Sequence, residues 1–264
     1  MDKMMKIAII QAVDASTGSD FEKRHFWQPC VNSVKSWAER RGFDHHFYAA
    51  PIQPKVQKSL NVEWNKSPKI LEIFFNKLSW MKDQADKYDV LCWIDGDMYC
   101  WGEPRNLFNG HFCDLSKFNF PVLHHMIRGD PRSWERVNSS LFWAPSDLIV
   151  ELADWMTSMV YNPELRGDLY ITFLSLCKQM RTDFTDEHAL TAWYYENKDR
   201  CVPHMVNPDH DEYNGCNWWY QPNNNPMYKK DSFIHLTKKY LDKMKFDAFR
   251  AYLAWEEKQD RWMK

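Results

Sequence analysis

The sequence has no long hydrophobic run, which excludes a chain that crosses a membrane as a helix. A spanning helix takes about 20 consecutive apolar residues, and no segment of the 264 residues approaches that length. The apolar run near the first residue is also too short for a secretory signal peptide. We therefore expect a cytoplasmic location.

Paired cysteines and an excess of one charge are missing as well. The seven cysteines are scattered and include no Cys-x-x-Cys pair, which argues against a disulfide framework and against a zinc site. Basic residues number 34 and acidic residues 36, for a formal net charge of −2. This balance gives no general attraction to nucleic-acid phosphates, so we expect no nucleic-acid partner.

Aromatic residues, in contrast, are abundant: 14 Trp, 12 Tyr and 16 Phe make up 16% of the chain. Large aromatic side chains fill hydrophobic cores, and they also form flat surfaces on which sugar rings or bases stack. We prefer core filling for most of them. With 44% hydrophobic and 27% charged residues, the composition is typical of a folded globular protein, and we expect one domain over 1–264.

The first hundred residues alternate between strand-like and helix-like patterns. Short apolar runs predict buried strands, and apolar residues at a spacing of three and four predict amphipathic helices. The predicted elements are a strand at 6–13, a helix at 29–42, a strand at 45–50, a helix at 68–86 and a strand at 89–94. Such alternation predicts a largely parallel sheet with helices on its faces, where ligands bind beyond the carboxyl ends of the strands.

The remainder of the chain continues this organisation. We predict strands at 120–125, 137–143 and 233–236, a helix capped by Ser146, a helix after Thr185, a long loop over 206–226 and a helix over 239–262. From Lys229 onward the chain has ten basic and six acidic residues. A basic amphipathic helix can bind a membrane surface, but we prefer packing of this helix against the sheet.

Two carboxylates, Asp95 and Asp97, stand at the end of the strongly apolar strand over 89–94. In an extended chain this spacing puts both side chains on one side, where two carboxylates repel each other unless a cation lies between them. Oxygen ligands suit Mn²⁺ or Mg²⁺. The alternative is an ordinary Asp-Gly turn at the end of a strand.

Two enzyme families with similar carboxylate pairs fit poorly. Phosphatases of the haloacid dehalogenase type have Asp-x-Asp-x-Thr after the first strand, whereas here the pair comes late and Tyr99 stands at the fifth position. Nucleotidylyltransferases that make sugar nucleotides have a glycine-rich, arginine-containing loop after the first strand. Residues 11–18 contain no arginine and only one glycine.

The sequence resembles the GT-A glycosyltransferases, in which an apolar strand ending in Asp-x-Asp follows a helix. Lys77-Leu78-Ser79-Trp80 and Trp93-Ile94-Asp95-Gly96-Asp97 carry this resemblance. Three later segments support it, namely Asn138-Ser139-Ser140 with Ser140 in place of the usual glycine, Asp186-Glu187 with Glu187 in place of glutamine, and Phe233-Ile234-His235. The resemblance spans about residues 5–240 and implies a Rossmann-like GT-A α/β fold, with a mixed, mostly parallel central sheet flanked by helices.

The resemblance also implies a division of the chain and a set of site residues. A nucleotide-binding half would cover about 1–100, a sugar and acceptor half about 101–240, and a C-terminal helix 240–264. The implied metal ligands are Asp95, Asp97 and His235, for Mn²⁺ or Mg²⁺. The residues expected toward the donor nucleotide, with a UDP-sugar favoured, are Lys77, Asp95, Lys238 and Lys239, together with Gln11, Ala12 and Val13 of the first strand. Those expected toward the sugar, or toward a glycan or other hydroxyl acceptor, are Asn138, Ser139 and Ser140, together with Trp218 and Trp219, because exposed aromatic rings suit the faces of sugars.

Asp186 and Glu187 are the implied catalytic residues. In an inverting reaction one of them would act as general base, and in a retaining reaction the pair would position the sugar. Acids in a first helical turn also favour the helix dipole without any catalytic role. For Lys77 we prefer the alternative of a solvent-exposed helix lysine. Trp218 and Trp219 have an alternative role as anchors of their loop in the core.

Two other functions remain open at this point. The tryptophan content also suits a non-catalytic carbohydrate-binding protein, and the same carboxylates suit a metal-dependent phosphoesterase. Glycan binding that does not depend on Mn²⁺ would indicate the first of these functions. Release of phosphate without any acceptor would indicate the second.

Overall fold

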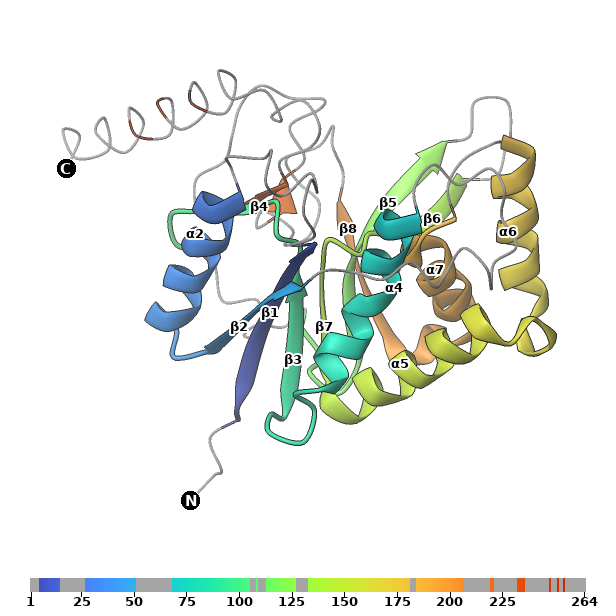
Figure 1. The fold of residues 1–264 in the computed structure, drawn as a ribbon, viewed down its shortest axis with the longest axis horizontal. Helices are drawn as coiled ribbons and strands as arrows, with labels where there is room; N and C mark the ends of the chain where they lie inside the picture. The colour runs from blue at the N-terminus through green and yellow to red at the C-terminus, as the bar shows by residue number, and fades with distance from the viewer. Residues whose placement is uncertain are drawn as a thin grey trace.

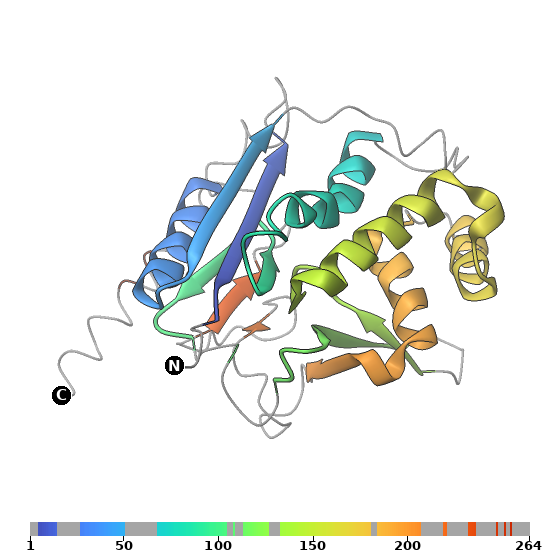
Figure 2. The same ribbon diagram turned by 90° about the horizontal axis from the view of Figure 1, so that it is seen from below.

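The computed structural model describes residues 5–14, 27–50, 68–104, 108, 113–126, 133–180, 184–206, 219–220 and 232–235, and the single positions 247, 251 and 254. These residues form a seven-stranded mixed sheet and a smaller three-stranded sheet. Helices cover both faces of the large sheet (Figures 1 and 2). The predicted α/β fold is confirmed.

The large sheet has the strand order β2-β1-β3-β7-β5-β6, and β8 pairs with β5. β1 runs parallel to β2 and β3, and β5 runs parallel to β8, whereas β7 is antiparallel to β3 and β5, and β6 is antiparallel to β5. The strands are β1 (Ile7–Asp14), β2 (Asp44–Ala50), β3 (Val90–Ile94), β5 (Phe118–Met126), β6 (Ser133–Val137), β7 (Leu141–Pro145) and β8 (Cys201–Val206).

Alternation along the central strands explains why the sheet is covered on both faces. Successive side chains of a strand point to opposite faces, so Ile10 and Trp93 join one hydrophobic cluster and Ile9 and Cys92 the other. Figure 2 shows α2 on one face, with α4 and α5 on the other. The helices are α2 (Trp27–Arg40), α4 (Pro68–Lys82), α5 (Ser146–Tyr161), α6 (Asp168–Met180) and α7 (Asp186–Glu196), with short 3₁₀ helices η1 (Pro163–Leu165) and η2 (Lys198–Arg200).

The small sheet brings the late part of the chain next to the Asp-x-Asp segment. It consists of β4 (Met98–Trp101), β10 (Ser232–His235) and β9 (Trp219–Tyr220), in the order β4-β10-β9. β10 pairs antiparallel with β4, and His235 lies opposite Met98. The predicted strand at 233–236 is therefore confirmed with a shift of one residue, and its end lies beside the residue that follows Asp97.

The predicted continuous strand over 137–143 is wrong, because the chain turns in the middle of it. β6 ends at Val137 and β7 begins at Leu141. In between, Asn138 Oδ1 accepts hydrogen bonds from Ser140 N, at 3.0 Å, and from Ser140 Oγ. Asparagine side chains that bond the main chain two residues on favour turns over strands.

Other elements also differ from the predictions. Pro145, not Ser146, is the N-cap of α5, because Ser146 Oγ donates to Tyr88 O, at 2.6 Å. α4 ends at Lys82 instead of reaching 86, and neither α6 nor β8 was predicted from the sequence. The predicted C-terminal helix lies outside the described residues, apart from the helical positions 247, 251 and 254.

Among the helices that the structure describes, none is both long enough and apolar enough to cross a bilayer.

The interior of the sheet contains a neutral histidine, His204 of β8. Its ring stacks on Trp143 with centroids 5.2 Å apart, and its Nε2 lies 3.3 Å from Asn119 Oδ1. Burial lowers the pKa of His204 to about 4, since removal from water disfavours the charged form.

We expect the free energy of unfolding to fall as the pH drops from 6.5, the usual pKa of histidine, toward about 4. In this window the unfolded chain binds a proton at His204 and the folded chain does not, which costs about 1.4 kcal/mol per pH unit. Urea denaturation at several pH values measures this slope. His204→Gln should reduce the slope of the free energy of unfolding against pH by the contribution of one proton. An equal slope in both proteins would contradict a neutral, buried His204.

Candidate functional site

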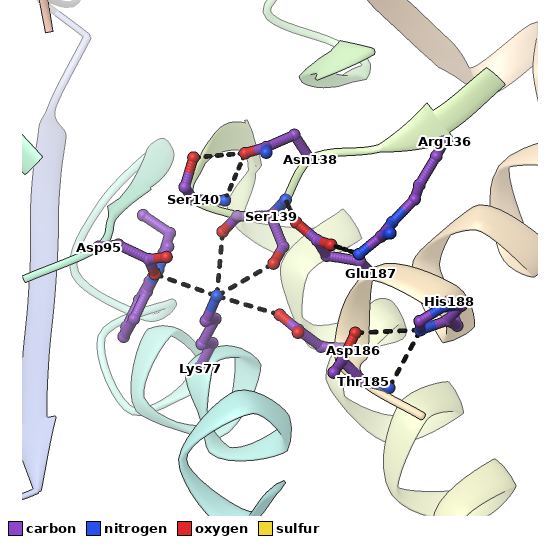
Figure 3. Close-up of polar contacts among 11 residues, drawn as sticks. Lys77, Asp95, Arg136, Asn138, Ser139, Ser140, Thr185, Asp186, Glu187 and His188 are labelled. Atoms are coloured by element: carbon purple, nitrogen blue, oxygen red, sulfur yellow. Dashed lines mark hydrogen bonds and ion pairs between the residues drawn. The ribbon is translucent and has the colours of Figure 1, made fainter. Parts of the chain in front are cut away.

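A buried lysine, Lys77 of α4, lies at the centre of the site (Figure 3). Its side chain is only 5% exposed, and its Nζ lies 3.0 Å from Asp95 Oδ1 and 3.1 Å from Asp186 Oδ2. The same amine donates to the carbonyl and to the hydroxyl oxygen of Ser139, at 3.1 and 3.0 Å. Lys77 thus joins the end of β3, the β6–β7 turn and the start of α7.

The charge of Lys77 is stabilised by these neighbours. Burial alone lowers the pKa of a lysine, but the charges of Asp186 and Asp95 and their hydrogen bonds raise the pKa of Lys77 above its ordinary value. Its Nζ also lies 5.6 Å from the centroid of the Trp93 ring, within the range of a cation–π contact. The alternative of a solvent-exposed lysine is therefore wrong.

The Asp95–Met98 segment forms a closed turn at the end of β3. Met98 N donates to Asp95 O, at 3.0 Å, and Asp95 N donates to Ser140 O, at 2.7 Å. Trp93 Nε1 donates to Asp95 Oδ1, at 2.6 Å. The Asp-Gly turn foreseen as an alternative is thus present, and it carries Asp95 and Asp97, both half-buried.

Position 96 in this turn has room only for a glycine, because a side chain there would collide with its neighbours. A Cβ atom there would lie 2.2 Å from Trp27 Cζ3 and 2.9 Å from Val13 Cγ1. Both distances are shorter than carbon atoms tolerate, so any side chain would push the turn away from the start of α2 and the end of β1.

Further contacts fix the start of α7. Arg136 Nη2 forms an ion pair with Glu187 Oε2, and Ser139 N donates to Glu187 Oε1, at 3.4 Å. Thr185 and His188 cap the helix reciprocally, with Thr185 N donating to His188 Nδ1, at 3.1 Å. Both predicted catalytic carboxylates therefore already face a cation, Lys77 for Asp186 and Arg136 for Glu187.

The structure brings four predicted site residues into direct contact: Lys77, Asp95, Ser139 and Asp186. Gln11, Ala12 and Val13 are buried in β1, and Asn138 and Ser140 are buried in the β6–β7 turn. His235 and Trp219 are placed by their main chains alone, in β10 and β9. Trp218, Lys238 and Lys239 lie outside the described residues.

Trp93 and Arg136 belong to the site but were not predicted. Trp93 precedes Asp95 by two positions, so the period of a strand places both on one side and could have indicated their contact. Arg136 gave no comparable signal, because its partner Glu187 lies 51 positions away.

The residues expected to bind a metal, Asp95, Asp97 and His235, are of the types that bind Mn²⁺ or Mg²⁺. Asp95 and Asp97 offer carboxylate oxygens from one turn, and the main-chain register brings His235 beside Met98; two carboxylates and an imidazole suit Mn²⁺. Among the described residues, no three His, Cys, Asp or Glu side chains are grouped closely enough to hold a metal. The His235 side chain is not among those described.

Comparison with known proteins identifies solved structures with a similar fold. No protein-family model matches the sequence, and no curated protein does. A crystal structure of a glycosyltransferase involved in the glycosylation of the major capsid of PBCV-1 is similar, with a TM-score of 0.51, 12% identity, and coverage of 89% of this chain and 95% of that chain. The chain has the fold of a GT-A glycosyltransferase.

A second similar structure is that of the galactosyltransferase LgtC in complex with donor and acceptor sugar analogs. Its TM-score is 0.45, with 9% identity and coverage of 87% of both chains.

Replacement of Gly96 tests the tight fit of the turn. We expect Gly96→Ala to lower the free energy of unfolding by about 1–3 kcal/mol, the usual cost of overpacking, because the new methyl group collides with Trp27. Chemical denaturation measures the loss. Gly167→Ala is the matched control, since its nearest neighbour is the flexible end of Glu196, at 3.0 Å; equal losses would contradict this packing.

Replacement of Lys77 tests the buried ion pairs. We expect Lys77→Met to lower the free energy of unfolding by about 3–5 kcal/mol, because it leaves the buried Asp186 and the half-buried Asp95 without their cation. The control on the same helix is Lys82→Met, whose ion pair with Asp154 has side chains 42% and 61% exposed and is worth about 0–1 kcal/mol.

A double variant separates the charge from the packing of the lysine side chain. Adding Asp186→Asn to Lys77→Met should recover part of the lost stability, since one uncompensated charge is removed. Full additivity of the two substitutions would show that Lys77 and Asp186 are not coupled.

Proposed function

We propose that this protein transfers a sugar from a nucleotide-diphosphate donor, with a UDP-sugar favoured, to a hydroxyl group of a glycan or other acceptor. The observation that carries this proposal is the convergence of Asp95, Ser139 and Asp186 on Lys77. They meet at the carboxyl end of β3, where open α/β sheets bind ligands. The fold shared with the PBCV-1 glycosyltransferase supports the same reaction.

Sugar transfer requires a nucleoside diphosphate to leave while the anomeric carbon gains positive charge, so negative charge must be stabilised on the leaving group. Asp97, together with Asp95 and His235, is proposed to hold Mn²⁺ or Mg²⁺. A divalent cation bound there would neutralise charge on the diphosphate. Lys238 and Lys239 are proposed to add positive charge at the same place.

The residues around Asp95 prepare this carboxylate before any ligand arrives. Its Oδ1 accepts from Trp93 Nε1 and faces Lys77 Nζ, at 2.6 and 3.0 Å. Both partners are buried, so neither has to be reoriented when the donor binds. Groups fixed in advance stabilise developing charge without a reorganisation cost during the reaction.

The two carboxylates at the start of α7 differ in their access to an acceptor. The Asp186 side chain is 4% exposed and faces Lys77, whereas that of Glu187 is 18% exposed. A general base must come within hydrogen-bond distance of the acceptor hydroxyl. We therefore assign the general base of an inverting reaction to Glu187 and a positioning role to Asp186; in a retaining reaction both would position the sugar. Trp218 and Trp219 are proposed to form the acceptor platform.

A thermal-shift experiment tests the donor site. We expect a UDP-sugar together with Mn²⁺ to raise the melting temperature, because a ligand that binds the folded state stabilises it by mass action, and we expect Asp97→Asn to abolish this shift. Asp86→Asn, at an exposed position, is the control and should keep the full shift.

Other nucleotides and acceptors separate the competing functions. If only GDP-sugars or CDP-sugars raised the melting temperature, the donor would be one of these and not a UDP-sugar. Metal-independent glycan binding, or release of phosphate without an acceptor, would replace sugar transfer by one of the other two functions. Absence of a shift with every nucleotide and metal pair would overturn the proposal.

A further inference from the structure

A buried amide, that of Gln11, lies beneath the Asp95–Met98 turn. Gln11 is 0% exposed in the middle of β1, and its neighbours on the same face of the strand, Ile9 and Val13, are apolar and equally buried. Burial of an amide costs about 1–3 kcal/mol unless its polar atoms are bonded. An aliphatic side chain would fill this buried position without that cost, so the amide of Gln11 needs an explanation other than packing.

Both ends of the Gln11 side chain are hydrogen-bonded to neighbouring strands. Its Nε2 donates to Asp95 O at the end of β3, at 3.1 Å. Its Oε1 lies 2.9 Å from His45 Nε2 of β2. The amide therefore connects the two strands that flank β1, and it reaches the turn from the side opposite to Lys77.

The atom that Gln11 contacts controls the direction of the turn. Asp95 O also accepts from Met98 N, so both acceptor positions of this carbonyl are in use. A carbonyl held by two donors fixes its peptide plane, and the plane between Asp95 and Gly96 sets the direction in which the chain continues to Asp97.

The carbonyl of Asp95 determines which way round the amide sits, because it can only accept a hydrogen bond. Burial, reinforced by the charges of Lys35 and His46, lowers the pKa of His45 to about 4, so the ring is neutral near pH 7. With the proton on Nε2, the ring donates to Gln11 Oε1 and leaves the NH₂ group for Asp95 O. The reversed amide would place two oxygens against each other, which disfavours it.

We propose that Gln11 and His45 are positioning residues that hold the Asp95–Met98 turn in the geometry that binds the donor diphosphate and its cation. This inference rests on the proposed function for what the turn binds. Gln11 acts through the main chain of Asp95 and does not itself touch the nucleotide. Partners of this outer kind typically change metal affinity or activity by about 10–100-fold.

The test is Gln11→Leu, with Asn119→Leu as matched control. Asn119 is also a fully buried amide on a central strand, bonded to main-chain oxygens of Asp114 and Lys117, at 2.8 and 2.7 Å, and lying near a histidine, His204. None of these partners belongs to the Asp95–Met98 turn. Both variants lose a buried amide, but only Gln11→Leu loses one that reaches the turn.

We expect Gln11→Leu to weaken Mn²⁺-dependent binding of the nucleotide by about tenfold or more, and Asn119→Leu to leave it within a factor of about two. His45→Phe keeps a ring and removes the donor, so it should weaken binding in the same direction, and it serves if Gln11→Leu does not fold. Wild-type affinity in folded Gln11→Leu and His45→Phe would overturn the proposal.

Amide hydrogen exchange of the ligand-free protein gives a readout that needs no substrate. The Met98 amide closes the turn, so it should exchange faster in Gln11→Leu than in wild type or in Asn119→Leu, relative to amides of β7. Unchanged Met98 exchange would overturn the positioning role. If wild-type protein binds no nucleotide with any metal, the proposed function fails, while Met98 exchange still decides whether Gln11 positions the turn.

Discussion

One buried amine constrains the whole site. A lysine that is 5% exposed keeps its charge only where carboxylates stand within contact distance, because the loss of water otherwise favours the neutral form. Lys77 therefore requires Asp95 and Asp186 together, and each of these fixes a different segment. The end of β3 and the start of α7, far apart in sequence, cannot move independently while this amine is charged.

The same turn is fixed from the opposite face of the sheet. Trp27 and Val13 leave no room for a side chain at Gly96, and Gln11 holds the carbonyl of Asp95. Clamped on both faces, the turn loses its conformational freedom during folding instead of during ligand binding. The buried amide of Gln11 is tolerated in an otherwise apolar strand because both of its ends are hydrogen-bonded.

The sequence predicts the architecture better than it predicts the interactions within the site. Strands buried on both faces appear as apolar runs, which is why β1, β3 and their flanking helices could be located. The β6–β7 turn could not, because the bond from Ser140 to Asn138 is local and leaves hydrophobic periodicity unchanged. The burial of Lys77 depends on Asp186, more than a hundred residues later, and no local pattern reports such a partner.

The charges of the site bear on what it can bind. Around the β3 end, the described side chains include two cations, Lys77 and Arg136, and four carboxylates, Asp95, Asp97, Asp186 and Glu187. Carboxylates repel a diphosphate, so a donor of the proposed kind is favoured by added positive charge near Asp95 and Asp97. A divalent cation held there would supply such charge, as would the proposed Lys238 and Lys239. The anionic donor and the metal are thus parts of one hypothesis, because the cation would let these carboxylates and the diphosphate lie close together.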